Sequence, residues 1–318
     1  MSSSASTPRL LVTGGTGFLG RHLAATFKDE FDVILTGRNY RQNAEAATTT
    51  GCRVLPMDIC RIDAVRDVFL ETDPRVVIHA AATKFVDLAE IQPLDCVDVN
   101  VGGSQNVLRV ALERDVETLI GVSTDKASPP IRNTYGLTKS LMERMFCAMD
   151  GRQGTRVACV RYGNVAWSTG SALTLWREMH RKGGVIESTG PDMRRFFFTV
   201  DEAAELVQTA VDRIEEVRGT VVVKKMGAAL IRDLLDVWVQ HFGGRWESVP
   251  VRQGDREDEY LVGEAELPFA SALSGNPVPH YTIDFAQPSA KPLTAPISSA
   301  TASRLTDSEM LALIRIGD

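Results

Sequence analysis

Two pairs of titratable side chains lie close together near the middle of the chain. Asp125 and Lys126 follow a mostly apolar run, Glu117 to Val122, that is typical of a buried strand. Tyr135 and Lys139 come next with the spacing Tyr-x-x-x-Lys, which places both side chains on one face of a helix. A carboxyl group beside an amine can supply the acid and the base of an elimination, and a tyrosine near a lysine can exchange a proton with a hydroxyl group. These residue types therefore predict a catalytic site.

Each pair also has an interpretation without chemistry. Lys126 could be a surface lysine, and Asp125 could be a turn residue that caps the segment after it. Tyr135 and Lys139 could be ordinary helix residues. We favour the catalytic interpretation, because packing alone does not require so many titratable groups after one strand.

A glycine-rich turn near the N-terminus has the pattern of a dinucleotide site. An apolar run, Arg9 to Thr13, is followed at once by Gly14-Gly15-Thr16-Gly17-Phe18-Leu19-Gly20 and then by helical periodicity. Strand, glycine turn and helix are the context that the dinucleotide fingerprint requires, although a loop could also contain such glycines by chance. Gly14 would allow the tight turn, Gly17 would let the pyrophosphate approach the backbone, and Gly20 would let the helix pack on the strand. The phosphates would then lie at the positive end of the helix.

The ends of the next two predicted strands indicate which dinucleotide is bound. Asp32 to Thr36 is followed by Arg38, where an NAD site would usually have an acidic residue. A guanidinium suits a 2′-phosphate through paired, charge-assisted hydrogen bonds, so we predict NADP rather than NAD, although Arg38 could also be a solvated surface residue. Cys52 to Leu55 is followed by Asp58, which either faces the adenine amino group or caps a helix.

Further cofactor contacts are expected after the fourth predicted strand, Arg75 to Ile78. Small residues follow it, and they would let a flat cofactor lie against the backbone. Asn100 lies inside a predicted helix, Pro93 to Arg114, where an asparagine adds little stability and so indicates a polar role. The predicted cofactor contacts are Gly14, Thr16, Gly17, Phe18, Leu19, Gly20, Arg38, Asp58, Ile59, Ala80, Ala81, Ala82, Lys84, Asn100, Tyr135 and Lys139.

Strands and helices alternate through the first half of the chain. This order predicts an α/β fold with a Rossmann-type, doubly wound parallel sheet and a smaller C-terminal substrate-binding portion. We expect a flexible arm over residues 1–8, an NADP-binding domain with the catalytic residues over 9–165, and a mainly nucleotide-sugar-binding portion over 166–318. Some segments of that last portion are expected to return to the first domain. Its predicted helices are Asp201 to Val217, Ile231 to Phe242 and, after a capping box of Thr306 and Glu309, Asp307 to Ile316.

Composition excludes several other classes of protein. The net charge is −6 and the basic residues form no stripe, so nucleic acid is not an expected partner. No apolar run approaches the roughly 20 residues that span a bilayer, and the Ser-rich N-terminus lacks the apolar core of a signal peptide. The five cysteines are scattered singly, which predicts reduced thiols in a cytoplasmic enzyme and no zinc or other metal site.

Together these motifs resemble the extended short-chain dehydrogenase/reductase superfamily. The sequence resembles its polysaccharide-biosynthesis branch, and within it the soluble, 5-inverting UDP-N-acetylglucosamine 4,6-dehydratases of the PseB type. The motifs that carry this resemblance are His79-Ala80-Ala81-Ala82-Thr83-Lys84, Ser123-Thr124-Asp125-Lys126-Ala127, Tyr135-Gly136-Leu137-Thr138-Lys139 and Arg161-Tyr162-Gly163-Asn164-Val165. The chain departs from the branch in three places: the segment from Asp125 to Tyr135 is one residue longer, Phe85 replaces a common His, and Gly254 to Glu259 only partly matches a Gly-Glu-Lys-Leu-His-Glu signature.

The resemblance implies an NDP-sugar 4,6-dehydratase. Tyr135, with its pKa lowered by Lys139, would take the proton of the 4-hydroxyl group while carbon 4 is oxidised, and Thr124 would hydrogen-bond the 4-oxygen. Lys126, held near neutral pH, would then remove the proton on carbon 5, a protonated Asp125 would assist the loss of the 6-hydroxyl group as water, and hydride would return to carbon 6. The resemblance also implies a homo-oligomer and a set of substrate contacts, which are Lys84, Asn164, Ser171 and Arg195 near the diphosphate, and Glu259 at the ribose.

Two other functions stay open at this point. A UDP-sugar 4-epimerase shares the oxidation by Tyr135 and Lys139 but has no need of an Asp–Lys pair. A protein that binds NADP or a nucleotide sugar without catalysis would not need the Tyr–Lys pair either. The motifs fix neither which hexose is the substrate nor whether carbon 5 is inverted.

Overall fold

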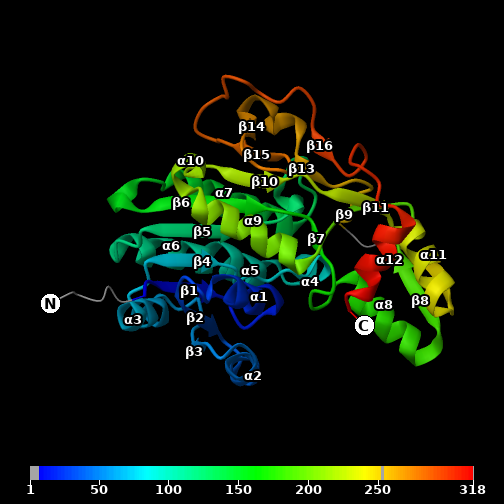
Figure 1. Ribbon diagram of the computed structural model, residues 1–318, viewed down its shortest axis with the longest axis horizontal. Helices are drawn as coiled ribbons and strands as arrows, with labels where there is room; N and C mark the ends of the chain where they lie inside the picture. The colour runs from blue at the N-terminus through cyan, green and yellow to red at the C-terminus, as the bar shows by residue number, and fades with distance from the viewer. Residues whose placement is uncertain (1–6, 252–253, 318) are drawn as a thin grey trace.

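A nine-stranded sheet forms the centre of the protein in the computed structural model, which describes residues 7–251 and 254–317 (Figure 1). Its strand order is β14-β15-β10-β6-β5-β4-β1-β2-β3, and the strands from β10 to β3 run parallel to one another. The strands are β1 (Arg9–Thr13), β2 (Asp32–Gly37), β3 (Arg53–Pro56), β4 (Val76–His79), β5 (Thr118–Val122), β6 (Arg156–Arg161), β10 (Val221–Lys224), β14 (Ala270–Leu273) and β15 (His280–Ile283). The parallel order confirms the predicted doubly wound fold.

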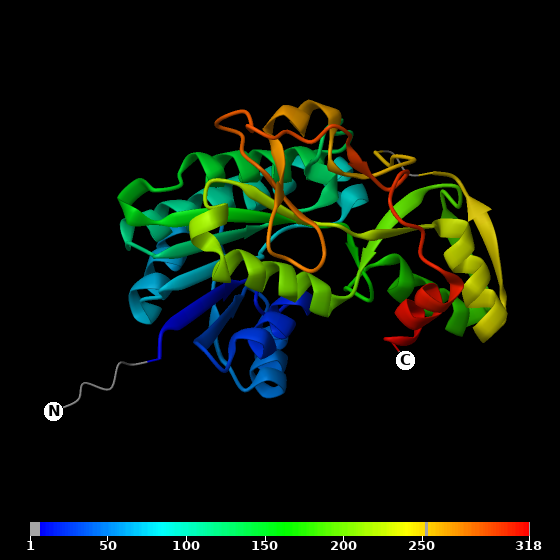
Figure 2. The same cartoon turned by 45° about the horizontal axis from the view of Figure 1, so that its top comes forward.

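Helices cover both faces of this sheet. On one side α1 packs against α9, and on the other side α3, α6 and α7 pack in a row (Figure 2). Every residue of β4 and β5 is buried, as expected of parallel strands that have helices on both faces. The helices around the sheet are α1 (Phe18–Phe27), α2 (Tyr40–Thr50), α3 (Ile62–Thr72), α6 (Ser104–Glu113), α7 (Thr134–Ala148), α9 (Val200–Asp212) and α10 (Ile214–Val217).

A smaller unit with its own apolar core lies beyond the end of the sheet (Figure 1). Its core contains Trp167, Trp176 and Trp238. The Trp238 ring meets that of Trp167 at a tilt of 36° and that of Trp176 edge-on, with ring centroids 6.2 and 6.3 Å apart. The elements of this unit and of its junction with the sheet are β7 (Asn164–Val165), α8 (Ala172–Gly183), β8 (Val185–Thr189), β9 (Arg194–Phe198), β11 (Gly227–Leu230), α11 (Ile231–Phe242), β12 (Arg245–Val249) and α12 (Asp307–Arg315).

Residues after 165 contribute to both parts of the molecule. β10, β14 and β15 complete the large sheet, and α9 covers one face of it. The final helix, α12, begins with the predicted capping box of Thr306 and Glu309, which confirms that prediction. The segment before α12 contains β16 (Ile297–Ser298), which pairs with β13 (Tyr260–Val262).

The predicted helix from Pro93 to Arg114 was wrong in its continuity. The chain forms α5 (Pro93–Val97), then a π-helical stretch, η1 (Asp98–Gly103), and then α6. Asn100 lies in the π-helical stretch, a type of bulge that is frequent at functional sites. Gly103 in the same stretch lies against the side chain of Ile59, where an added Cβ would be only 2.6 Å from Cδ1. A second predicted helix, Asp201 to Val217, is likewise divided at Arg213 into α9 and α10.

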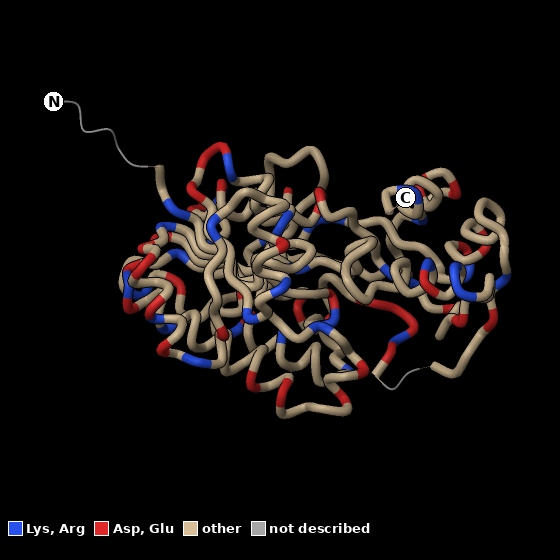
Figure 3. Tube along the Cα trace, turned by 90° about the horizontal axis from the view of Figure 1, so that it is seen from below, with Lys and Arg blue, Asp and Glu red and all other residues tan. Residues whose placement is uncertain are grey.

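The described part of the chain can be compared with the predictions about charge, membrane spans and cysteines. Lys and Arg are interspersed with Asp and Glu along the trace (Figure 3). None of the described helices is long and apolar enough to cross a bilayer. The five cysteines are all free, and no group of residues in the described part of the chain is arranged to hold a metal ion. The predicted arm, residues 1–8, falls mostly on residues 1–6, outside the described residues, and a cytoplasmic location stays a prediction.

Candidate active site

The Asp–Lys pair lies in a short 3-10 turn, η2 (Asp125–Ala127), immediately after β5. Thr124 precedes the turn with extended backbone, and its side-chain oxygen accepts a hydrogen bond from the Lys126 N–H at 3.4 Å. The same hydroxyl group donates to Asp125 Oδ1 at 3.0 Å, and Lys126 Nζ donates to that oxygen at 3.1 Å. One carboxylate oxygen therefore receives two donors at the carboxyl end of a central strand.

The second oxygen of Asp125 has a different environment. Asp125 is fully buried, and its Oδ2 has no hydrogen-bond partner among the described residues. Burial raises the pKa of this carboxyl group, and the nearby charge of Glu259 raises it further, while Lys126 acts in the opposite direction. Gly163 lies beside Oδ2, since a Cβ added there would be 3.1 Å away. An oxygen that is buried, unpartnered and attached to a group of raised pKa is suited to carry a proton and donate it.

Lys126 contacts groups from two other parts of the chain. Its Nζ donates to Asn164 Oδ1 at 3.4 Å and lies 3.7 Å from Glu259 Oε1. Burial alone would lower the pKa of Lys126, but the charges of Asp125 and Glu259 outweigh it and raise the pKa above the ordinary value. The predicted pKa near neutrality was therefore wrong in direction, because the sequence did not reveal that a second carboxylate lies beside the amine.

Tyr135 lies in the first turn of α7, opposite the Asp–Lys pair. Asn133 caps this helix by accepting from the Gly136 N–H at 2.7 Å. Burial raises the pKa of Tyr135 to about 12, while the charge of Lys126 and a hydrogen bond with Thr124 act to lower it. The tyrosine is therefore close to the hydroxyl group of Thr124 and to the ammonium group of Lys126.

Lys139 lies one turn further along α7 and is also buried. Burial lowers its pKa to about 8, and its Nζ donates to Met142 Sδ at 3.2 Å. The prediction that Lys139 lowers the pKa of Tyr135 was wrong for this structure: the cation that acts on Tyr135 is Lys126, and the pKa is raised overall because the phenol is buried.

The glycine turn forms a cradle that fits a dinucleotide. Gly14 has φ +66°, and a Cβ there would lie 2.7 Å from the Ala81 Cα atom, so the turn and the end of β4 approach too closely for a side chain. Gly20 also packs closely on Gly15, since a Cβ on Gly20 would lie 2.4 Å from the Gly15 Cα atom. Gly17 is the N-cap of α1 and offers no side-chain cap, so the first N–H groups of that ten-residue helix are available to phosphate oxygens.

The other predicted cofactor residues border this cradle. Thr16, Phe18 and Leu19 belong to the turn and the first turn of α1, where Thr16 is buried against Gly37. Arg38 follows β2 with an exposed side chain that forms no ion pair with the described residues. Asp58 caps a turn rather than a helix, because its Oδ1 accepts from the Cys60 N–H at 3.0 Å.

A chain of buried hydrogen bonds joins the cradle to Asn100. Ser104 Oγ donates to the Asn100 carbonyl at 2.7 Å and so accepts from His79 Nε2, at 2.8 Å. Thr13 therefore donates to His79 Nδ1, at 2.7 Å, and accepts from the Ala81 N–H at 3.3 Å. Burial lowers the pKa of His79 to about 3, which keeps the ring neutral as this pattern requires. The backbone of Ala80, Ala81 and Ala82, the segment expected to face the cofactor, is thereby tied to β1 and α6.

Asn100 extends this network to α7, the helix that carries Tyr135 and Lys139. Its amide oxygen accepts from the Thr83 N–H at 2.8 Å, and its amide nitrogen donates to the Thr83 carbonyl at 2.9 Å and to Thr138 Oγ1 at 3.1 Å. Thr138 in turn donates to the Tyr135 carbonyl at 2.8 Å. Asn100 thus connects the cofactor side of β4 to the first turn of α7.

The predicted substrate residues fall into two groups. Asn164, Glu259 and Arg195 lie at the Asp–Lys pair, where Arg195 Nε is 3.9 Å from Glu259 Oε1. Lys84 and Ser171 are not brought to that pair by any contact: Lys84 is exposed beside the Phe85 ring, and Ser171 is the N-cap of α8. Lys84 and Ser171 lie near each other, because their chain neighbours Phe85 and Gly170 are in contact: a Cβ on Gly170 would be 2.4 Å from the Phe85 ring. The roles of all five residues at the diphosphate and the ribose stay predictions.

Two important residues escaped the sequence analysis. Arg256 is buried in the partly matched signature and contacts both Glu259 and the turn after Asp125. Arg161, at the start of the fourth motif, forms a buried ion triad with Glu143 and Glu266. A buried Arg161 could have been suspected from its place at the end of an apolar strand, but its partners lie too far away in the sequence to be paired by spacing.

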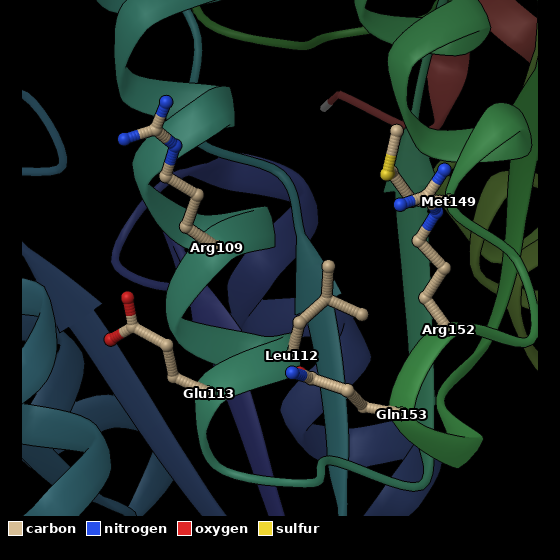
Figure 4. A pocket seen from close by; sticks show the side chains of 6 residues that line it. All are labelled: Arg109, Leu112, Glu113, Met149, Arg152 and Gln153. Carbon is tan, nitrogen blue, oxygen red and sulfur yellow. The ribbon is translucent and has the colours of Figure 1, made fainter.

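One open cavity lies away from these residues. It has a volume of about 480 Å³ and lies between the C-terminal ends of α6 and α7 (Figure 4). It is lined by Arg109, Leu112, Glu113, Met149, Arg152 and Gln153. Tyr135 is at the other end of the 15-residue α7, about 20 Å away along the helix axis. This cavity therefore takes no part in the candidate site.

Comparison with known proteins agrees with this geometry. The model of the polysaccharide biosynthesis protein family matches residues 10–273. The chain belongs to that family. This confirms the resemblance inferred from the four motifs.

Three curated relatives align with most of the chain. A protein of Methanocaldococcus jannaschii, named as an uncharacterised membrane protein, is 34% identical and the alignment covers 81% of each chain. The inverting UDP-N-acetylglucosamine 4,6-dehydratase of Campylobacter jejuni is 28% identical, with 80% of this chain and 77% of that protein covered. The UDP-glucose 4-epimerase of Rickettsia akari is 30% identical, with 84% and 81% covered.

One solved structure has nearly the same fold throughout. The X-ray structure of Pen from Bacillus thuringiensis superposes with a TM-score of 0.89 and covers 99% of both chains, at 23% sequence identity. The smaller unit and the large sheet are therefore both shared with that protein.

Proposed function

We propose that the protein is a nucleotide-sugar 4,6-dehydratase whose substrate is UDP-N-acetylglucosamine. The observation that carries this proposal is the buried Asp125–Lys126 pair, placed beside Tyr135 and containing one carboxyl oxygen without a partner among the described residues. An elimination needs a base that removes a proton from one carbon and an acid that protonates the leaving group on the next carbon. An oxidation alone needs no acid for a leaving group. The Campylobacter relative carries this activity in its name.

The side chains divide the reaction between them. Tyr135 exchanges a proton with the 4-hydroxyl group of the sugar, and Thr124, which is hydrogen-bonded to it, holds the 4-oxygen. A bound nicotinamide dinucleotide supplies the hydride acceptor for carbon 4 and the hydride donor for carbon 6. Lys126 removes the proton on carbon 5, which the 4-keto group has made acidic, and it must first lose its own proton because Asp125 and Glu259 raise its pKa. Asp125 donates its proton to the departing 6-hydroxyl group, so that carbon–oxygen cleavage releases water.

The cofactor proposed for this site is NADP. The glycine cradle and the uncapped start of α1 suit a pyrophosphate, and the exposed Arg38 at the end of β2 suits a 2′-phosphate. No acidic residue stands at Gly37, Arg38 or Asn39 to hold the ribose hydroxyl groups of NAD.

A UDP-sugar 4-epimerase is the second candidate, because the Rickettsia relative has that name. An epimerase needs the tyrosine for oxidation and reduction at carbon 4, but it has no leaving group for Asp125 to protonate. The two functions therefore differ in whether the product has lost water. A protein that binds without catalysis is disfavoured by the buried, titratable surroundings of Tyr135 and Lys139.

Proton NMR of the product formed in deuterated water tests the proposal. Purified protein is incubated with UDP-N-acetylglucosamine and catalytic NADP. We expect a methyl signal for the 6-deoxy sugar, loss of the carbon 6 hydroxymethyl signals and deuterium at carbon 5. The configuration at carbon 5 follows from the couplings of the same spectrum, and we propose inversion. UDP-N-acetylgalactosamine as the only product would instead establish the epimerase, and an unchanged substrate would refute both enzymes.

We also propose that the protein is a homo-oligomer. α4 (Val86–Ile91) and α5 pack on α7, and these helices expose a group of large apolar side chains. The group comprises Leu88, Ile91, Leu94, Val97, Leu137 and Leu141, of which Ile91 and Leu94 are 73% and 77% exposed. An apolar face of this kind favours burial against a second copy. Sedimentation should show a dimer or larger assembly that the double variant Leu94→Asp/Leu141→Asp dissociates, and a monomeric wild-type protein would contradict this.

A further inference from the structure

Arg256 connects two of the three places in which this chain departs from the branch that it resembles, the Asp125–Tyr135 segment and the Gly254–Glu259 segment. The side chain is 4% exposed. Its Nη1 donates to the carbonyl groups of Ser128 at 3.2 Å and Pro130 at 2.7 Å, and its Nη2 donates to the carbonyl of Asp125 at 3.3 Å. One guanidinium from the partly matched signature therefore holds both ends of the lengthened turn that follows the Asp–Lys pair.

The turn needs donors that its own sequence does not provide. Pro129 and Pro130 have no backbone N–H, so they add carbonyl groups without adding donors. A buried carbonyl group that lacks a partner is unfavourable. The planar guanidinium presents several N–H groups in fixed directions and can reach three carbonyls at once, which a lysine ammonium in the same place could do less well. Of these three, only the Asp125 carbonyl is also given a backbone donor by the described residues, the Ser128 N–H at 3.2 Å.

The same guanidinium also orients Glu259. Arg256 Nη2 forms an ion pair with Glu259 Oε2, while the other carboxylate oxygen, Oε1, faces Lys126 Nζ at 3.7 Å. The loop is fixed from behind by Arg195, whose guanidinium donates to the carbonyl groups of Arg256 at 2.8 Å and Glu257 at 3.2 Å. Arg256 thus reaches the Asp–Lys pair by two routes, through the main chain of the turn and through Glu259.

Space around the turn leaves few alternative positions for it. A Cβ on Gly136 would lie 2.2 Å from the Lys126 carbonyl oxygen, and a Cβ on Gly263 would lie 2.1 Å from the Pro129 carbonyl oxygen. The turn is therefore enclosed between α7 and the end of β13, with Arg256 filling the third side.

We propose that Arg256 is a positioning residue for the elimination step, acting through the Asp125–Pro130 turn and through Glu259. This inference rests on the proposed dehydratase function. Tyr135 and Lys139 lie on α7, which the Asn133 cap and the Glu143–Arg161 ion pair fix without direct contact with the Arg256 side chain. Loss of Arg256 should therefore displace the acid and base of the elimination while it leaves the oxidation at carbon 4 largely in place. A displacement of roughly 1 Å can lower a rate about 100-fold.

Two substrates separate the two steps experimentally. UDP-N-acetylglucosamine reports the whole reaction as loss of water. Its 6-deoxy analogue has no leaving group, so it reports the oxidation alone through the absorbance of the reduced cofactor, and exchange of its carbon 5 proton in deuterated water reports the base. For Arg256→Ala we expect water loss and carbon 5 exchange to fall ~100-fold, and oxidation of the analogue to change by no more than about threefold. Arg256→Lys should lie between the wild-type protein and Arg256→Ala.

Arg194→Ala is the matched control. Arg194 contacts the same loop, but from its outer side and through the side chains of Glu257 and Asp258. A partly exposed pair of this kind contributes little, so both rates should stay within about twofold of the wild-type rates. Added guanidinium ion should restore part of the elimination in Arg256→Ala and none in the control, which distinguishes a lost group from general damage.

Hydrogen exchange gives a readout that does not depend on the chemistry. Peptides covering residues 125–131 should exchange faster in Arg256→Ala, while peptides of α7 should not change. If Arg256→Ala does not fold, Arg256→Lys carries the same comparison. Equal losses of oxidation and elimination, or no rescue by guanidinium, would overturn the positioning role alone. A wild-type protein that loses no water from the sugar would overturn the proposed function, and the positioning role with it.

Discussion

A buried arginine joins α7 to the neighbouring strand, and its removal should be measurable as a large loss of stability. Arg161 at the end of β6 donates five hydrogen bonds, as many as a guanidinium has N–H groups. Two go to Glu143 on α7, two to Glu266 and one to the Leu261 carbonyl. The side chains of Arg161 and Glu143 are completely buried, and that of Glu266 is 4% exposed.

Arg161→Met would leave both carboxylates buried without their cation. Breaking a buried pair in this way costs roughly 3–5 kcal/mol. At roughly 2.1 cal/mol/K of unfolding entropy per residue, a chain of 318 residues has about 0.67 kcal/mol/K, so the midpoint of thermal unfolding should fall by about 4 to 8 °C. Scanning calorimetry of the two proteins at the same pH measures this shift directly.

Arg66→Met is the matched control. Arg66 also forms a two-pronged contact, with both distances to Glu113 at 3.0 Å, but these side chains are about half exposed. A surface pair contributes about 1 kcal/mol or less, so the midpoint should move by less than about 2 °C. A shift in Arg161→Met no larger than in this control would refute the argument that burial makes the triad important.

The pH dependence of the same difference provides a second test. Burial alone would raise the pKa of Glu266, but the charge and hydrogen bonds of Arg161, with those from Gly263 and Ser128, lower it overall. A carboxyl group with a lowered folded pKa stabilises the protein above its unfolded pKa, and this contribution is lost as pH falls through the folded pKa. The gap between wild-type protein and Arg161→Met should therefore be full at neutral pH and shrink below about pH 4.5. A gap that does not depend on pH would contradict the ionic origin.

Three further predictions concern the site itself. Tyr135→Phe should lower the rate of water loss by at least ~100-fold with an unchanged unfolding midpoint, as followed by product NMR, and a smaller effect would remove Tyr135 from the proton exchange. Arg38→Glu should weaken NADP binding by roughly 10- to 100-fold and NAD binding much less in fluorescence titrations, because charge-assisted hydrogen bonds to the 2′-phosphate are lost; equal effects on both would favour the surface interpretation. UDP binding should be accompanied by proton uptake in the wild-type protein and not in Asp125→Asn, as measured by calorimetry in buffers of different ionisation enthalpy, because an anion near Asp125 raises its pKa further; equal uptake in both proteins would place the proton elsewhere.

The sequence predicted the sheet well because buried parallel strands appear as short apolar runs between glycines and polar turns. It missed α2, since Tyr40–Thr50 is polar along most of its length and only Ala46 is buried. It also could not show the break in the helix that contains Asn100, because the apolar periodicity of 93–114 continues across the π-helical stretch. Local pattern identifies an element, but contacts with other elements determine where that element bends.

In the candidate site too, residues that are close in sequence were predicted, and residues that only the fold brings together were not. Asp125, Lys126 and Tyr135 were found because they are close in sequence and unusual in type. Arg256 was not found, because its contact with the Asp125 carbonyl spans 131 positions along the chain. The protonation of Lys126 was misjudged for the same reason: its pKa depends on Glu259, a residue that only the fold brings to it.

The charges around the Asp–Lys pair explain why its carboxyl group can hold a proton in an otherwise cationic setting. Lys126, Arg195 and Arg256 are three cations, and Asp125 and Glu259 are two acids, so one positive charge is in excess when all five ionise. The cations pair first with Glu259, whose pKa they lower despite its burial, and this leaves Asp125 with one oxygen that no described donor reaches. Protonation of Asp125 raises the excess to two positive charges. A diphosphate or an oxyanion on the sugar would offset that excess, whereas a neutral ligand would not. The arrangement that raises the pKa of Asp125 therefore also favours an anionic ligand, which links the proposed elimination to the proposed recognition of a nucleotide sugar.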